Sequence, residues 1–213
     1  MKKIMLFIAI LSVALAGMSQ SKEFTSAMSE GITQLAECKT IDDYQTLGNR
    51  FSVIANAEKA EWLPFYYHSY CYILMSFIEQ ADAAKKDAYL DVAEKSINKM
   101  IELAPQESEV YVLQGMMYSA RLLVNPIERG QEYSAISAQA IGTALGLDVN
   151  NPRAKLMKLR NDMGTATFFG KDPKEFCPQA SEILASWDNY KVKSPLYPSW
   201  GKNQLATIVA GCK

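Results

Sequence analysis

The sequence predicts an all-α protein built from antiparallel pairs of helices. Apolar residues recur every three or four positions along most of the 213-residue chain, which is the spacing of one face of a helix. Helix-ending signals such as Pro105 and Asn125-Pro126 divide this pattern into segments of helical length. The sequence has no strand-like alternation that competes with helix and no low-complexity linker. We therefore expect one helical domain over residues 20–213.

The first nineteen residues have the form of a secretory signal peptide. Lys2 and Lys3 give a basic start, residues 4–16 are apolar apart from Ser12, and small residues follow. The apolar run is shorter than the roughly 20 residues that a membrane span needs. We expect a cleaved export signal over residues 1–19, and a periplasmic or secreted protein without stable membrane insertion.

Export places the four cysteines where disulfides persist. Four cysteines allow three pairings, and the sequence alone does not choose among them. Cys177 and Cys212 lie in the last two segments, so we expect a disulfide between them that fastens the C-terminal tail to the last helices. Cys71 lies in an aromatic helix and is expected to be a buried small hydrophobe. The state of Cys38 stays open.

The charge of the chain argues against nucleic-acid binding. Without the signal peptide, 20 basic side chains face 23 acidic ones, so the mature protein is slightly acidic. A nucleic-acid-binding domain usually carries a basic patch or stripe. We expect no nucleic-acid partner.

The expected helices follow one another at short intervals. Thr40 with Asp42 and Asp43 is a capping start, and Pro64 is tolerated in the first turn of its helix. Residues 127–130 and 164–173 are expected to form turns, and residues 191–199 an extended tail. The expected helical segments are residues 23–37, 40–54, 60–79, 89–103, 108–125, 133–147, a helix opening at 152, 178–189 and 204–210.

The closing helices of two helix pairs share a pattern of four positions. The first is small, the second is bulky, the third is either small or bulky, and the fourth is Pro, which Val149 replaces in the second pair. The residues are Ala93, Ile97, Met100 and Pro105, then Ser137, Ile141, Ala144 and Val149. The opening helices carry an aromatic, a small residue and a Tyr, namely Phe65, Ser69 and Tyr72, then Tyr111, Gly115 and Tyr118. A small residue is needed there because the two helices of a pair approach closely.

This pattern resembles the tetratricopeptide repeat family over residues 40–152, best in the repeats 60–105 and 106–149. The repeat length here is in the mid-forties, against about 34 in the standard repeat, because the joints between helices are longer. The resemblance implies a short right-handed solenoid of helix hairpins closed by a C-terminal capping tail. The whole chain also resembles small exported bacterial repeat proteins of unassigned activity.

The resemblance further implies a concave groove lined by the opening helices. The groove residues would be Tyr66, Tyr67, Tyr70, Leu113, Met116, Ser119, Arg153, Met157 and Arg160. This surface is aromatic at one end, apolar at its centre and basic at the other end, which suits a peptide or short helix with an acidic end. The alternative is that the tail from Lys191 onward, or the first helix, fills the groove and makes these residues core.

Catalytic chemistry has little support in the sequence. The single histidine, His68, has no second imidazole for a metal site, and no nucleophile elbow or phosphate loop is present. We expect that the protein is not an enzyme and holds no metal or cofactor. We expect a scaffold in the cell envelope that binds a protein or peptide. The alternatives are a structural envelope subunit that self-associates, and a small-ligand carrier or enzyme with a pocket near His68.

Overall fold

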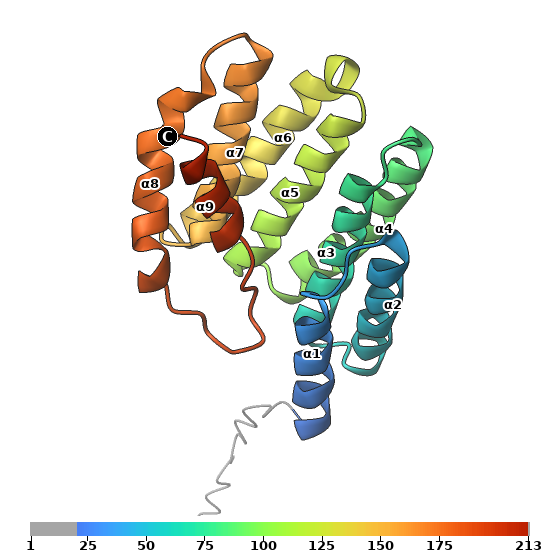
Figure 1. Ribbon diagram of the computed structural model, residues 1–213. Coiled ribbons are helices and arrows are strands. Elements are labelled where there is room, and N and C mark those ends of the chain that lie inside the picture. Colours follow the sequence, from blue (N-terminus) through green and yellow to red (C-terminus); the bar gives the residue numbers. More distant parts are fainter. Residues whose placement is uncertain (1–20, 213) are drawn as a thin grey trace, which may run out of the picture.

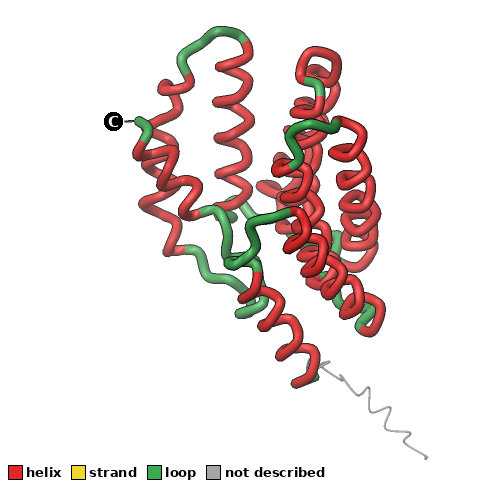
Figure 2. Tube along the Cα trace, turned by 45° about the vertical axis from the view of Figure 1, so that its right-hand side comes forward, coloured by secondary structure: helices red, strands yellow, loops and turns green. Residues whose placement is uncertain are grey.

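The computed structural model describes residues 21–212, and the predicted signal peptide lies outside these residues. The described part of the chain is helical, without strands, as Figure 2 shows, which confirms the predicted all-α class. The elements are α1 (Lys22–Gln34), α2 (Ile41–Ala57), α3 (Leu63–Ile78), α4 (Ala83–Leu103), α5 (Ser108–Val124), α6 (Pro126–Leu147), α7 (Pro152–Phe168), η1 (Pro173–Phe176), α8 (Cys177–Ser186), η2 (Trp187–Asn189) and α9 (Lys202–Ala210).

Helices that follow one another in sequence pack side by side from α1 to α7 (Figure 1). Short connections reverse the chain direction between them, so the neighbours are antiparallel. The opening helices α3, α5 and α7 also contact one another in this order. After α7 the chain turns back through η1 into α8, and α9 packs against α8. A right-handed solenoid path for the helix pairs stays a prediction.

Capping residues fix where several helices begin. Thr40 accepts a hydrogen bond from the backbone N–H of Asp43, whose carboxylate in turn accepts from the backbone N–H of Thr40, so the predicted capping start is present. Asn151 caps α7 by accepting from the backbone N–H groups of Arg153 and Ala154. Each such cap satisfies backbone donors that the helix itself leaves without a partner.

Two predicted helix starts were too late. The segment 127–130, expected to be a turn, is the first part of α6, because Asn125 caps the helix and Pro126 occupies its first position. Likewise α4 begins at Ala83 under the cap of Asp82, six residues before the predicted start.

The small residues of the repeat pattern lie where paired helices approach closely. A Cβ atom added at Gly115 of α5 would lie 2.5 Å from Cδ1 of Ile141 in α6. At the equivalent place in the preceding pair, the Ser69 hydroxyl donates to the carbonyl oxygen of Ala93 at 3.1 Å. Both contacts agree with the reason given for small residues at these positions.

The buried side chains form two clusters. The larger one runs from α1 to α7 and is centred on the aromatic helix α3. The smaller one joins α7, α8 and α9 through Leu156, Ile183, Trp187 and Leu205. Trp200, just before α9, packs against both clusters. The C-terminal tail therefore connects the two cores.

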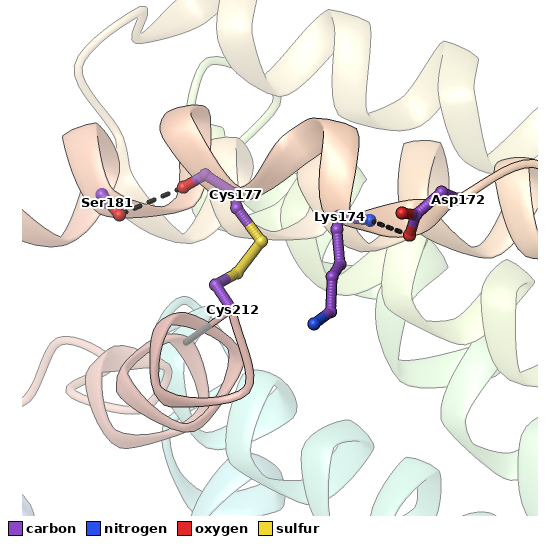
Figure 3. The surroundings of a disulfide bond; sticks show 5 residues. All are labelled: Asp172, Lys174, Cys177, Ser181 and Cys212. Carbon is purple, nitrogen blue, oxygen red and sulfur yellow. Dashed lines mark hydrogen bonds between the residues drawn. A yellow bond between two sulfur atoms is a disulfide. The ribbon is translucent and has the colours of Figure 1, made fainter.

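A disulfide joins the two C-terminal helices. Cys177 is the first residue of α8, Cys212 follows the end of α9, and their Cα atoms lie 5.8 Å apart (Figure 3). This confirms the predicted pairing. Cys71 is buried, as expected, and Cys38 is half-buried with a free thiol. Within residues 21–212, the helices are too short or too polar to cross a membrane.

Candidate functional site

The C-terminal tail, residues 190–201, covers the aromatic end of the predicted groove. The Tyr67 hydroxyl donates to the carbonyl oxygen of Leu196 at 2.8 Å. The indole N–H of Trp200 donates to the Tyr66 hydroxyl at 2.8 Å, and its ring stacks on Tyr70 with 5.5 Å between centroids. All three tyrosines are buried. The alternative in which the tail fills this groove is therefore the one that the structure supports.

Carboxylates fasten the same tail to the helix pairs. Glu107 accepts from the ammonium of Lys193 at 2.7 Å and from the Tyr197 hydroxyl at 2.8 Å. Asp148 accepts from the Tyr190 hydroxyl at 2.8 Å. Burial raises the pKa of both tail tyrosines, and these carboxylates raise it further, so both hydroxyls remain donors at neutral pH.

The centre of the predicted groove is core. Leu113, Met116 and Met157 are buried in the larger cluster. Ser119 is half-buried, and its hydroxyl bonds to Ser137 of α6 and Asn161 of α7. These residues hold helices together and leave no apolar face open there.

The two arginines of the predicted basic end differ in environment. Arg160 is exposed, and one guanidinium nitrogen donates to Gln204 of α9 at 3.3 Å. Arg153 is 2% exposed and its Nε lies 2.9 Å and 3.0 Å from the two carboxylate oxygens of Glu109. Burial raises the pKa of Glu109, and the charge of Arg153 opposes that shift. Arg153 is thus committed to a structural ion pair.

His68 lies in packed surroundings. Its Nδ1 is 2.7 Å from the Ser96 hydroxyl, and its ring centroid is 4.8 Å from that of Tyr72. Burial lowers the pKa of His68 to about 4, so the imidazole is neutral at physiological pH. Within residues 21–212, no cluster of three His, Cys, Asp or Glu side chains is arranged to hold a metal ion.

Two shallow concavities lie away from His68. One, of about 400 Å³, borders α1 and the ion pair of Arg50 with Glu30. The other, of about 520 Å³, lies between the start of α7 and η2 and is lined by polar groups that include Lys155, Asn189 and Lys191. Neither has the apolar lining that is common in small-molecule sites.

Exposed apolar side chains gather at one end of the helix array. Leu123 and Ile127 flank the α5–α6 connection and are 56% and 89% exposed. Phe168 and Phe169 end α7 and are 62% and 70% exposed, with their rings perpendicular and 5.3 Å apart. The sequence interpretation missed this surface because it treated residues 127–130 and 164–173 as turns. The Phe-Phe pair before Gly170 was the available signal.

Comparison with models of protein families and with curated proteins finds no match. Among solved structures, the chain is similar to the HusA haemophore from Porphyromonas gingivalis, with 30% sequence identity and a TM-score of 0.78. The alignment covers 91% of this chain and 94% of that chain.

This similarity corrects the predicted function and partners. A relative that is a haemophore overturns the protein- or peptide-binding scaffold, and the proposed small-ligand carrier alternative agrees with it better. The structure gives a physical reason why the peptide-binding prediction was wrong. The aromatic face that was predicted to bind a peptide binds the chain's own C-terminal tail instead.

Proposed function

The chain belongs to the family of the HusA haemophore, and from this membership we propose that it is an exported carrier of haem. The observation that carries the proposal is the similarity to that haemophore over nearly the whole of both chains. Carriage requires reversible binding and no bond-making step, so we propose no catalytic role for any residue.

Export is part of the same proposal. The Cys177–Cys212 disulfide supports it, because disulfides persist mainly in oxidising compartments outside the cytoplasm. The predicted signal peptide over residues 1–19 would direct the protein there and would be removed. The mature carrier would then begin close to residue 20.

The histidine allows a specific question about how haem would be held. Haem iron in proteins is often ligated by His, Met, Tyr or Cys. His68 is the one histidine of the chain, and it is engaged by Ser96 and packed against Tyr72. Ligation through His68 would require this packing to open, so we propose that binding does not depend on it.

Haemin titration of the mature protein, residues 20–213, tests the proposal. We expect a saturable change in the Soret absorbance and quenching of Trp fluorescence, with one haemin per chain. A His68→Gln variant should bind with the same affinity. An absorbance change that rises without saturation, as with nonspecific adsorption, would contradict the proposed function.

A further inference from the structure

The contacts of α6 establish which of its faces meets α7. Arg129 reaches back to Asp87 of α4, with both guanidinium nitrogens 2.7 Å from the carboxylate. Ser137 faces the interior, where it bonds to Asn161 of α7 at 2.8 Å. Measured from Ser137 around the α6 axis at about 100° per residue, Gly130 lies about 20° away, Ser134 about 60° and Ile127 about 80°, all on the side away from Arg129. Because Ser137 meets α7 and Arg129 meets α4, this is the side of α6 nearer to α7.

The same hydrogen bond sets the register between the two helices. Since α6 and α7 are antiparallel, moving seven residues from Ser137 toward the start of α6 corresponds to moving seven residues from Asn161 toward the end of α7. Seven residues are almost two full turns, so the helix face is retained. Gly130 and Phe168 are therefore at the same level, and each is on the face that its helix turns toward the other.

Each of these two positions borders space that the fold leaves open. No heavy atom lies within 4 Å of a Cβ built on Gly130, and Phe168 keeps 62% of its surface exposed although it is on the α6 side of α7. Apart from the bond between Ser137 and Asn161, no hydrogen bond or ion pair joins α6 to α7 in residues 21–212. We call the surface formed by Ile127, Gly130, Ser134, Phe168 and Phe169 the α6–α7 notch.

The notch has the properties that a flat apolar macrocycle requires. Phe168, Phe169 and Ile127 offer aromatic and aliphatic surface that the fold leaves exposed. Gly130 lets a ring approach the helix backbone closely, which any larger side chain would prevent. Lys171, two residues after Phe169, is an exposed cation at the edge of the notch and can pair with a carboxylate.

We propose that the α6–α7 notch is the surface on which this chain binds its porphyrin cargo, with the ring between Gly130 and Phe168 and a propionate beside Lys171. The inference rests on the proposed function, because it assigns a place to that cargo. A flat apolar ring with carboxylates on its edge matches an apolar notch with a cation at its rim.

Steric filling of the notch gives the sharpest test. Gly130→Trp should weaken haemin binding at least tenfold, because the indole occupies the place of the ring. Gly142→Trp is the matched control, since Gly142 lies in the same helix, about three turns away, and a Cβ added there also meets no heavy atom within 4 Å. Circular dichroism and thermal melting should show equal helicity for the two variants.

Removal of contacts gives an independent test. Phe168→Ala combined with Phe169→Ala should weaken haemin binding about tenfold, while Val53→Ala, at another exposed apolar position, should not. Lys171→Gln should weaken binding a few-fold at low ionic strength and less in high salt, because an exposed ion pair is screened.

The outcomes separate the two proposals. If the wild-type chain does not bind haemin saturably, the proposed function fails. If it binds and the Gly130→Trp and double Phe variants bind equally well, the notch is rejected while the function stands. If the double Phe variant instead changes the sedimentation of the protein without haemin, the notch is a self-association surface and the inference is again overturned.

Discussion

Glu109 in the first turn of α5 and Arg153 in the first turn of α7 form an ion pair that is almost completely buried, at 0% and 2% side-chain exposure. Asn151, the cap of α7, also donates to Glu109 at 2.7 Å. The pair joins two successive opening helices at the same end. Glu109 and Arg153 both lie at positions where the sequence predicts a helix start. The sequence does not predict that they are buried, because their burial depends on the packing of α5 against α7.

Breaking this pair on one side should destabilise the fold. Arg153→Met leaves the Glu109 carboxylate buried without its partner, and we expect a loss of about 3–5 kcal/mol in the free energy of unfolding. The double variant Glu109→Leu with Arg153→Met should lose much less, since it leaves no unpaired charge. Urea unfolding of the three proteins measures both effects. Equal losses in single and double variants would contradict the burial argument.

The close approach at Gly115 makes a second prediction. Gly115→Ala places a methyl group 2.5 Å and 2.7 Å from Cδ1 and Cγ1 of Ile141, and we expect a loss of about 1–3 kcal/mol from overpacking. Combining it with Ile141→Val should cost less than the sum of the two single changes, because the valine gives room. Gly142→Ala, at an open helical position, should instead be neutral or slightly stabilising.

Much of the fold could be predicted because its determinants are local. Thr40 with Asp43 specifies a helix start by itself, and Gly115 indicates a close helix contact from its place in the repeat pattern. The late predicted start of α6 shows the limit. The sequence pattern predicts a helix end at Asn125-Pro126, although the same two residues also form the cap and first position of the next helix.

The candidate site was harder to predict because it depends on contacts distant in sequence. Tyr66 and Trp200 are separated by 134 positions, and nothing in the local pattern of α3 indicates that the tail reaches it. Local periodicity therefore identified the aromatic face of α3 correctly. It could not show whether that face binds a ligand or the C-terminal tail of the same chain.

The packing of the C-terminal tail against α3 can be tested by removing one hydrogen bond. Trp200→Phe keeps a ring to stack on Tyr70 and removes the donor to the buried Tyr66 hydroxyl. We expect the free energy of unfolding to fall by about 1–3 kcal/mol, because a buried hydroxyl without its partner carries a desolvation cost. Tyr66→Phe combined with Trp200→Phe should recover part of it. A single variant with wild-type stability would show that the tail does not rest on this bond.

The disulfide should stabilise the C-terminal helices. Cys177 and Cys212 are 35 positions apart, and closing a loop of this length contributes about 3–4 kcal/mol in the chain-entropy treatment. Cys177→Ser with Cys212→Ser should therefore lower the melting temperature. Hydrogen exchange should rise first in α8 and α9, and α2 and α3 should serve as the internal control.

His68 makes stability depend on pH in a direction that its burial fixes. Its pKa falls from 6.5 to about 4 in the fold, so between these values the unfolded chain binds more protons than the folded one. Stability is therefore full above pH 6.5 and declines as pH falls toward 4. We expect the wild type to lose about 1–2 kcal/mol between pH 7.5 and pH 5 relative to His68→Gln, in which this proton site is absent. Urea unfolding of both proteins at several pH values isolates the difference, because the carboxylates they share contribute equally. Parallel stability curves would mean that His68 is as accessible to protons in the fold as in the unfolded chain.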